Sequence, residues 1–477
     1  MKANPVPDAA SFRDPDGYVF RVGERVFRAL RRSGLDLYQT FRESEAAQWG
    51  ERQGLITRSW ELKPEERVGI GELPSDVVSV LEQERIPFLN YPYEWSFDML
   101  KDAALLQIDL LLGMAQYQFT LKDATAFNIQ FVGAKPIFID VLSFMPYKPG
   151  TPWIGYAQFC QGLLYPLALK ALAGVDFQPI LRSYPDGIPI ALVKKILGIR
   201  AWLHPGMFKH VVLQSALQRS FAKKTPDLAK EFEDLQFSLN HVVGLLRAIK
   251  GQVARLSPRQ KLSHWASYQE ERSYLPQALE HKRAFVRKHL ETIAASTVWD
   301  LGCNTGEFSL LAADCARQVI ALDADPDSVN KLYLHCRHYG ISRILPLVSD
   351  LTNPSPALGW NQRERVSLLE RGKPECILAL ALIHHLCLIK NVPFSRIFEL
   401  FARLEARHVI IEFIPKSDPM VKELLVNRED VYPWYTQSVF EKEAAAFFSI
   451  GDRLELEKDG RLLYWLIRRS DAQLPAQ

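Results

Sequence analysis

The stretch VWDLGCNTGEFSLLAADCARQVIALDAD, residues 298–325, decides how the second half of this chain folds. It reads as an apolar strand, a tight turn with two glycines, a helix, and a second apolar strand that ends on an acid. A β-α-β unit of this kind predicts a parallel sheet, and ligands bind such sheets at the carboxyl ends of the strands. The turn at 300–306 lies at such an end, so we expect a small polar ligand there.

The same alternation continues along the chain, with helices expected before the stretch and between later strands. The chain then closes with DRLELEKDGRLLYWLIRR, in which Asp459-Gly460 predicts a hairpin. Residues 257–477 are therefore expected to form an α/β domain, a Rossmann-like parallel sheet with a C-terminal antiparallel hairpin. The parallel strands are expected at 297–301, 318–322, 344–349, 375–380 and 408–413.

Two glycines and an asparagine shape the turn. Gly302 and Gly306 remove side chains where a ligand and the backbone must come close, and Asn304 tolerates left-handed geometry better than most residues. The G-x-G-x-x-G spacing of dinucleotide sites is absent, and Glu307 would place a negative charge where a pyrophosphate lies. A cationic or zwitterionic ligand fits this turn better.

Acids follow at the ends of the next two strands. Asp323 ends the second strand, about twenty residues beyond the turn, where a carboxylate can accept hydrogen bonds from both ribose hydroxyls. Asp350 ends the third strand, in ILPLVSDLTNPSP, and is placed to meet an adenine edge. The site thus favours a nucleoside that carries no phosphate.

The motifs DLGCNTG, ALDAD, SDL and ALALIHHL occur in this order. Together they resemble the successive motifs of class I S-adenosylmethionine-dependent methyltransferases, with Asn304 in place of the usual central glycine. More narrowly, DLTNPSPALGW, ALALIHHL and IEFIPKSDPMV are similar to bacterial nodulation-protein (NoeA-like) methyltransferases. The resemblance covers residues 260–477 and implies S-adenosylmethionine as the cofactor. It implies that the methionine part is held by Asp300, Gly302 and Gly306, the ribose by Asp323, and the adenine by Asp350, with Asn304 also in the cofactor-binding turn.

Candidates for a catalytic base follow the fourth and fifth strands. Methyl transfer from a sulfonium depends mainly on alignment, but a hydroxyl acceptor also needs a base. His384 and His385 lie at the expected mouth of the site, and a pKa near the unperturbed value of about 6.5 suits this role. Glu412, at the end of the fifth strand, is the second candidate. The alternatives are that the histidines cap or pack against a helix and that Glu412 is a structural acid.

Aromatic residues near the predicted site are candidates for ligand contact or for core packing. Tyr432, Trp434 and Tyr435, in REDVYPWYT, are candidates for an acceptor pocket. Tyr268 and Tyr274 lie on the leading helices, which often cover the cofactor in this fold.

The N-terminal half predicts an α+β domain at 1–175 and a helical region at 176–256. In LKDATAFNIQFVGAKPIFIDVLSF, Asp123 and Asn128 are followed by Asp140 at the end of an apolar strand. This order resembles the loop of protein kinases that places the hydroxyl and holds magnesium. Asn128 and Asp140 are metal candidates only under that kinase-like interpretation, and no other metal site is expected.

The kinase pattern is incomplete. Leu121, Lys122 and the pair Val141-Leu142 replace characteristic kinase residues, and no glycine-rich phosphate loop precedes them. A kinase-like fold and a plain hairpin with turn-forming Asp and Asn both remain open.

Composition and charge limit the classes of function. The chain has 477 residues, 48% hydrophobic and 24% charged, as is typical of globular proteins. A net charge of +3 gives no strong field for nucleic acid or an anionic membrane. The sequence predicts no signal peptide, no membrane span, and no CxxC pair among its six cysteines. We therefore expect a cytoplasmic location.

The sequence thus predicts S-adenosylmethionine-dependent methyl transfer to a small-molecule or glycan-type acceptor, at oxygen. One alternative is a binding or regulatory protein whose N-terminal half is a degenerate kinase-like module. Another is an RNA methyltransferase, although the near-neutral charge argues against a nucleic-acid partner. Oligomeric state and the acceptor itself cannot be read from the residues. Basic residues of the helical region are candidates for contact with RNA or another anionic partner, and solvated helix faces are the simpler explanation. These residues are Lys194, Lys195, Arg200, Lys209, Arg219, Lys223 and Lys224.

Overall fold

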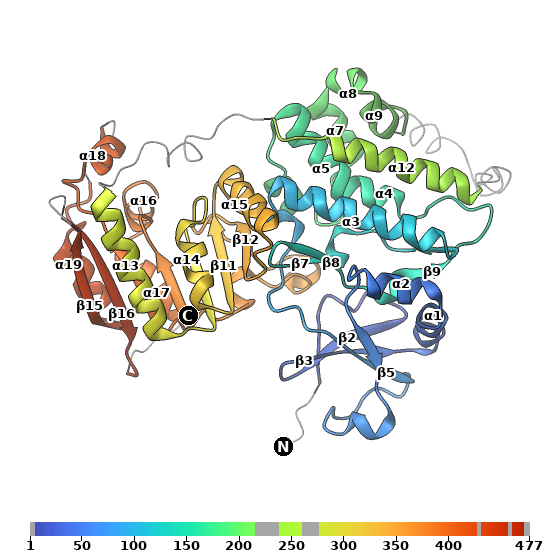
Figure 1. Cartoon of the computed structure of the whole chain (residues 1–477), viewed down its shortest axis with the longest axis horizontal. Coiled ribbons are helices and arrows are strands. Elements are labelled where there is room, and N and C mark those ends of the chain that lie inside the picture. The colour runs from blue at the N-terminus through green and yellow to red at the C-terminus, as the bar shows by residue number, and fades with distance from the viewer. Residues whose placement is uncertain (1–4, 215–237, 260–275, 427–430, 457–459, 472–477) are drawn as a thin grey trace. The chain divides into compact units, whose positions relative to one another are not determined.

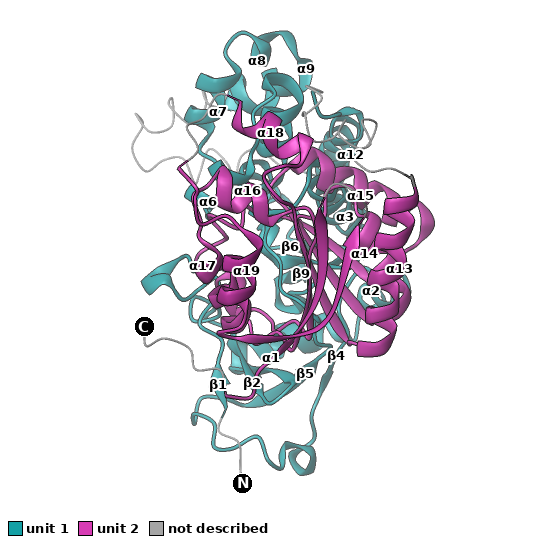
Figure 2. Ribbon diagram, turned by 90° about the vertical axis from the view of Figure 1, so that its left-hand side faces the viewer, with its two compact units in different colours: residues 1–261, 357–366 teal, residues 262–356, 367–477 magenta. Residues whose placement is uncertain are grey.

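The computed structural model describes residues 5–214, 238–259, 276–426, 431–456 and 460–471, and Figure 1 traces their elements. The chain divides into two units (Figure 2). Unit 1 contains residues 1–261 and 357–366, and unit 2 contains residues 262–356 and 367–477. Several residues singled out above lie outside the described part of the chain: Tyr268, Tyr274, Arg219, Lys223 and Lys224.

Unit 2 is built on a seven-stranded sheet in the order β12-β11-β10-β13-β14-β16-β15. Its first five strands along the chain pair in parallel and are buried, as expected for a sheet covered by helices on both faces. Each strand end lies within one residue of its predicted position, so the predicted Rossmann-like sheet is confirmed. These strands are β10 (Thr297–Leu301), β11 (Gln318–Asp323), β12 (Ile344–Val348), β13 (Cys376–Ala379) and β14 (His408–Phe413).

The C-terminal hairpin closes this sheet. Strands β15 (Phe448–Leu456) and β16 (Arg461–Arg468) pair with each other, and β16 pairs antiparallel with β14. This confirms the predicted antiparallel hairpin. The edge strand β15 carries a bulge between Ile450 and Asp452 and alternates exposed and half-buried side chains, features that protect a sheet edge from further pairing.

Helices cover both faces of the sheet (Figure 2). Helices α13 and α14 lie on one face, and α17 and α19 lie on the other. Aromatic side chains join the second layer to the sheet, because Phe440 of α19 contacts Phe413 of β14 and Phe398 of α17. The helices are α13 (Pro276–Ile293), α14 (Glu307–Cys315), α15 (Pro326–Tyr339), α16 (Ile383–Leu388), α17 (Phe394–Arg403), α18 (Pro419–Leu425) and α19 (Gln437–Ala444).

Unit 1 begins with a five-stranded antiparallel sheet in the order β1-β2-β3-β5-β4. A hairpin turning at Gly23, which has a φ of 58°, joins β2 to β3. Helices α1 (Arg32–Arg42) and α2 (Glu45–Arg52) follow β3. The strands are β1 (Val6–Pro7), β2 (Gly17–Val22), β3 (Arg25–Leu30), β4 (Ser59–Glu61) and β5 (Ser79–Gln83).

The second part of unit 1 is dominated by helices. The long helix α3 (Phe97–Ala115) packs against α12 (Leu239–Arg255), and Lys250 Nζ donates to Asp109 Oδ1 across this contact at 2.5 Å. Short strands follow α3: β6 (Phe119–Leu121), β7 (Ile129–Val132), β8 (Lys135–Phe138) and β9 (Phe144–Pro146). Further short helices are α4 (Tyr156–Phe159), α5 (Tyr165–Ala168), α6 (Gln178–Ser183), α7 (Ile190–Leu197), α8 (Arg200–Leu203) and α9 (Pro205–Met207).

A segment from the C-terminal half also packs within unit 1. Residues 357–366 lie between β12 and β13 in the chain, inside the range predicted for the methyltransferase domain. Arg13 Nε donates to Glu364 Oε1 at 2.6 Å, and the backbone N–H of Val366 donates to the Tyr91 hydroxyl at 2.9 Å.

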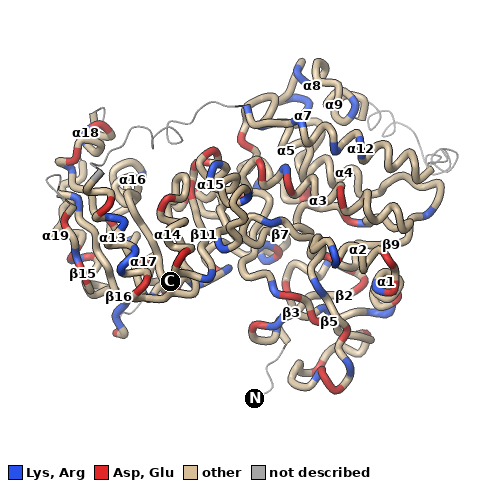
Figure 3. Tube along the Cα trace, in the orientation of Figure 1, with Lys and Arg blue, Asp and Glu red and all other residues tan. Residues whose placement is uncertain are grey.

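No helix within the described residues is long and apolar enough to cross a bilayer. Figure 3 shows Lys and Arg mixed with Asp and Glu along both units, which gives the RNA alternative no support. The cytoplasmic location stays a prediction.

Candidate active site

The candidate site lies at the carboxyl ends of the central strands of unit 2. The chain runs from β10 outward through β11 to β12 and then returns to β13 on the other side of β10. The strand order therefore reverses beside β10, which is where open parallel sheets bind ligands. The turn at 302–306 leaves β10 at this edge, and β13 leads there into helix α16.

Positive φ angles explain the residue types of the turn. Gly302 has a φ of 76°, Asn304 of 49° and Gly306 of 91°, a region that favours glycine and tolerates asparagine. A Cβ on Gly306 would lie 2.2 Å from a side-chain carbon of Leu332, and one on Gly302 would lie 3.0 Å from Leu382. The glycines are thus required by backbone conformation and protein packing, in addition to the space that a ligand needs.

Asp323 fixes the turn from the end of β11. Its Oδ2 accepts from the backbone N–H of Asn304 at 2.8 Å, and its Oδ1 accepts from that of Asp325 at 2.8 Å. Burial raises the pKa of this carboxyl. Each carboxylate oxygen has a second lone pair, so Asp323 can hold the turn and still accept bonds from ligand hydroxyls.

Asp300 is the most enclosed acid of the site. It is buried on β10, and its Oδ2 accepts from the Ser309 hydroxyl of α14 at 2.6 Å. Burial raises its pKa to about 6, and repulsion from Asp323 adds to the shift. An acid with this pKa favours a cationic partner, because a positive charge stabilises its ionised form.

The turn also holds an unsatisfied acceptor. Asn304 Oδ1 is buried and has no hydrogen-bond partner among the described residues. A buried polar atom without a partner is uncommon in proteins and points to a missing ligand group. With Asp300 and Asp323 close by, the chemistry fits the ammonium and ribose hydroxyls of S-adenosylmethionine and opposes a pyrophosphate.

Asp350 is less enclosed than Asp300 and Asp323. It follows β12 and is half-buried, and its Oδ1 accepts from the backbone N–H and the hydroxyl of Thr352 at 2.8 and 2.7 Å. Lys390 Nζ lies 3.8 Å from its Oδ2. The predicted contact with adenine stays a prediction.

His384 and His385 occupy the first turn of α16, with ring centroids 4.0 Å apart. His384 is buried, and its Nδ1 has no hydrogen-bond partner in the part of the chain that the structure describes. Burial lowers its pKa well below the usual value. Burial lowers the pKa of the half-buried His385 to about 4. Both rings are therefore neutral at pH 7, and the ionisation expected near 6.5 from the sequence is displaced downward.

Glu412 is fully buried at the end of β14. Its Oε2 accepts from Lys282 Nζ of α13 at 2.7 Å and from the backbone N–H of Ala381 at 2.9 Å. Lys282 is only 2% exposed and lies over the Phe308 ring. Ala381 has a φ of 50°, so Glu412 holds the strained turn from which α16 starts.

The aromatic candidates lie beyond β14. Tyr435 is buried, its hydroxyl donates to the backbone oxygen of Ile414 at 2.9 Å, and burial raises its pKa well above the usual value. Tyr432 is also buried and donates to Asn391. Trp434 is half-buried and contacts Phe394 edge-on.

In unit 1, the three residues of the kinase-like pattern do gather. Asp123, in which burial raises the pKa, bonds to Asn128, and Asn128 Nδ2 donates to Ser143 Oγ at 3.3 Å. Asp140 accepts from Ser143 and forms an ion pair with the buried Arg28 of β3. Burial would raise the pKa of Asp140, but Arg28 and Ser143 outweigh it and lower the value.

Asp140 is therefore neutralised by the protein itself. Within the described residues, no group of three or more His, Cys, Asp or Glu side chains is arranged to hold a metal ion.

Sequence reasoning missed Lys282, Ser309 and Arg28, which position the acids. A helical pattern could have found Lys282, because it shares the buried stripe of α13 with Ala278, Phe285 and His289. A lysine on such a stripe predicts a buried carboxylate partner. The partner itself cannot be read from the helix.

Fold and site together define the class of unit 2. Its sheet has this strand order, with a glycine turn after the first strand, an acid at the end of the second and an antiparallel closing hairpin. Unit 2 is therefore a class I S-adenosylmethionine-dependent methyltransferase. S-adenosylmethionine is its cofactor.

Over 436 residues, the chain is 33% identical to nodulation protein NoeA of Rhizobium meliloti (strain 1021), covering 91% of this chain and 90% of that protein. The chain therefore belongs to the NoeA family. No family model matches it.

Two solved methyltransferase structures are similar to part of the chain. N-methyltransferase NodS from Bradyrhizobium japonicum WM9, in complex with S-adenosyl-l-homocysteine, is 12% identical with a TM-score of 0.31, covering 44% of this chain and all of NodS. Magnesium protoporphyrin IX methyltransferase (ChlM) from Synechocystis PCC 6803 with bound SAM is 16% identical with a TM-score of 0.28, covering 40% of this chain and 80% of ChlM. These TM-scores are too low to support the assignment to class I methyltransferases, which is based on the strand order and the glycine turn.

Proposed function

We propose that unit 2 transfers the methyl group to a hydroxyl of a small-molecule or glycan-type acceptor, with His385 or His384 as the base. The observation that carries this proposal is the placement of two neutral imidazoles beside the glycine turn. Leu382, two residues before His384, packs 3.0 Å from where a Cβ on Gly302 would lie. The start of α16 therefore adjoins the turn that receives the cofactor.

When bound, S-adenosylmethionine supplies a methyl carbon on a sulfonium: the acceptor oxygen bonds to that carbon as the carbon–sulfur bond breaks and its electron pair stays on sulfur. The hydroxyl proton must leave at the same time. A neutral imidazole can accept it and pass it to water, and His385, the more exposed of the two, is the better placed. Glu412 is held by Lys282, so we assign it a positioning role.

For the cofactor, we propose that Asp300 and Asn304 accept from its ammonium group. Asp323 would accept from the ribose hydroxyls, and Asp350 would meet the adenine. The glycine backbone at 302 and 306 leaves room for these contacts. The direct test is S-adenosylhomocysteine formation by the full chain with hydroxyl-bearing acceptors. Product formed with amines or thiols alone would overturn the oxygen assignment.

Asp300 gives the cofactor affinity an expected pH dependence. Because its pKa in the protein is about 6, the carboxylate that pairs with the ammonium group is lost as the pH falls through that value. Affinity for S-adenosylmethionine should therefore fall below pH 6, by about tenfold per pH unit at the limit. Calorimetric titration from pH 5 to pH 8 measures this. Asp300→Asn should bind weakly with a flat profile, and a flat wild-type profile would contradict the role of Asp300.

A second proposal concerns unit 1, where the grouping of Asp123, Asn128 and Asp140 favours a kinase-like binding module that does not transfer phosphate. The Arg28–Asp140 pair leaves no free carboxylate at the position that would hold magnesium. We expect the full chain to release no ADP from ATP and magnesium. Measurable ATP turnover that Asp140→Ala abolishes would show that phosphotransfer is live and overturn this proposal.

A further inference from the structure

A short helix at one end of unit 1 exposes large apolar side chains. Ile199, directly before α8, is 72% exposed, and Trp202 and Leu203 of α8 are 56% and 76% exposed. Figure 1 places α8 and α9 at the end of unit 1 opposite the strands β2, β3 and β5. Large apolar side chains that lie exposed beside each other mark an interaction site, whereas scattered ones are ordinary. We call residues 199–203 the α8 tip.

The local backbone keeps these side chains outside. Gly198, with a φ of 54°, ends α7, and Pro205 begins α9 two residues after the tip. Ala201 is 0% exposed, so it takes the inward position of this single helical turn. Positions one or two residues away from it point sideways or outward, because a helix has 3.6 residues per turn. The exposure of the α8 tip therefore follows from the way this turn is folded.

The α8 tip lies in a cationic part of the chain. Residues 187–226 contain no Asp or Glu, and α8 packs against α7, α9 and the π-helix Phe208–Leu213, which all come from this range. None of the Lys and Arg side chains that the structure describes in this range forms an ion pair with another described residue. The net charge of +3 is therefore an average that conceals a local excess of positive charge. The described basic residues are Lys194, Lys195, Arg200 and Lys209.

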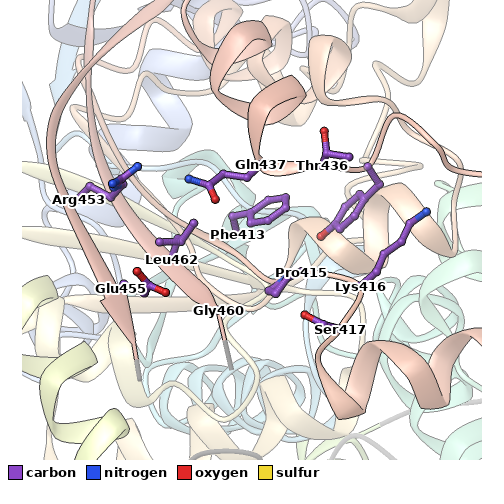
Figure 4. Close-up of a pocket in the computed structure, with 11 residues that line it drawn as sticks. Phe413, Pro415, Lys416, Ser417, Thr436, Gln437, Arg453, Glu455, Gly460 and Leu462 are labelled. Carbon is purple, nitrogen blue, oxygen red and sulfur yellow. The ribbon is translucent and has the colours of Figure 1, made fainter. Parts of the chain in front are cut away.

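The pocket at the end of β14 in unit 2 differs in this respect (Figure 4). Lys416 and Arg453 lie on its wall. Lys416 Nζ donates to the backbone oxygen of Tyr432 at 2.6 Å, and Arg453 Nη1 lies 3.4 Å from Glu441 Oε1. These cations have partners inside the protein, whereas those around the α8 tip remain available to an external partner.

We propose that the α8 tip docks unit 1 on an anionic lipid surface. In this arrangement Ile199, Trp202 and Leu203 enter the boundary between lipid headgroups and acyl chains. Aliphatic side chains leave water there, and tryptophan keeps its N–H group near water. The flanking cations lie at the level of the lipid phosphates, and each Lys or Arg near such a surface strengthens binding about fivefold. The inference does not depend on the proposed methyl transfer.

A lipid surface fits the α8 tip better than RNA or an acidic protein segment does. Phosphates or carboxylates alone satisfy the basic residues, but they leave Ile199 and Leu203 in water. Single-stranded RNA gains affinity by stacking its bases on aromatic rings, and the tip offers one such ring beside two aliphatic side chains. A partner with an anionic face and an apolar interior uses both features of the tip.

The test is flotation of the full chain with vesicles of phosphatidylcholine, either alone or with about 30% phosphatidylglycerol. At about 0.1 M salt the protein should bind the anionic vesicles and should bind the neutral ones at least tenfold less. Ile199→Ser/Leu203→Ser should weaken binding tenfold or more, because two aliphatic side chains no longer leave water. Lys195→Ala/Arg200→Ala should weaken it about twenty-fivefold, which is about fivefold for each charge.

Matched substitutions elsewhere serve as controls. All four positions changed in the tip and α7 are exposed, so these variants should fold, which circular dichroism checks. Trp60→Ser, on β4 of unit 1, removes another exposed aromatic side chain and should bind as wild type does. Lys422→Ala/Arg317→Ala removes two exposed charges of unit 2 and should also leave binding unchanged.

Tryptophan fluorescence gives a second readout. Anionic vesicles with bromine on the acyl chains should quench the fluorescence of the wild type, because Trp202 lies beside those chains. Trp202→Phe keeps an apolar ring, so it should still float with the vesicles but lose most of this quenching. Quenching that persists in Trp202→Phe would show that another surface faces the lipid and would overturn the inference.

Three flotation results would also contradict it: binding to neither kind of vesicle, equal binding to both, or binding that Ile199→Ser/Leu203→Ser leaves intact. So would binding of single-stranded RNA or polyglutamate that is tighter than vesicle binding at the same salt concentration. That result would assign the α8 tip to a nucleic acid or to an acidic protein.

Discussion

Replacing Lys282 with alanine should lower the free energy of unfolding by about 3–5 kcal/mol, the usual effect of breaking one side of a buried ion pair. Glu412 is 0% exposed, so the substitution leaves a carboxylate inside the protein that has lost its lysine partner. The strained turn before α16 then loses its support, and turnover should fall together with stability. Urea unfolding followed by circular dichroism measures the first effect.

Two further variants separate charge from packing. Lys288→Ala, on the same helix but 66% exposed, should change stability by about 0.5 kcal/mol or less. The double variant Lys282→Met/Glu412→Gln removes both charges and keeps an acceptor for Ala381, so it should recover most of the lost stability. A Lys282→Ala protein as stable as wild type would show that the pair does not hold the turn.

Replacing His385 with alanine should lower turnover about 10²–10⁴-fold while cofactor affinity changes little, which is the scale of general-base catalysis. Burial lowers the pKa of His385 to about 4, so the ring is neutral and able to accept a proton above that pH. Activity of the wild type should therefore fall as the pH drops through about 4, and not near 6.5. Rates of S-adenosylhomocysteine formation across this pH range measure both effects.

His338→Ala, an exposed histidine of α15, serves as the control and should leave turnover unchanged. If the larger loss occurs in His384→Ala, the buried ring is the base. If neither substitution lowers turnover while cofactor binding persists, the base assignment is wrong. The reaction would then depend on alignment alone, and an amine, thiol or carbon acceptor would fit better than a hydroxyl.

The parallel sheet could be predicted because its signals are local. Each strand is a short apolar run, and the Gly302 to Gly306 turn and the hairpin before Arg461 follow from residues next to each other in the chain. Asp323 could be placed because one helix separates the two strands whose ends must meet. The glycine turn and the position of Asp323 could therefore be predicted from short-range spacing.

The supports of the site could not be predicted because they depend on distant pairing. Lys282 and Glu412 are 130 residues apart, and Arg28 and Asp140 are 112 apart. No local sequence pattern predicts which buried acid pairs with which buried base. The predicted pKa of His385 was wrong for the same reason. The pKa is set by burial of the side chain, which appears only after the elements have packed.

The central claim is that S-adenosylmethionine binds at the turn between β10 and α14, with Asp323 among its ligands. Isothermal titration calorimetry of the full chain tests it most directly, with folding checked by circular dichroism. We predict saturable binding to wild type and a loss of about 1–3 kcal/mol in Asp323→Ala, the scale for a lost polar contact. A folded wild type that releases no binding heat at any temperature tried, or an Asp323→Ala protein that binds as tightly as wild type, would contradict the claim.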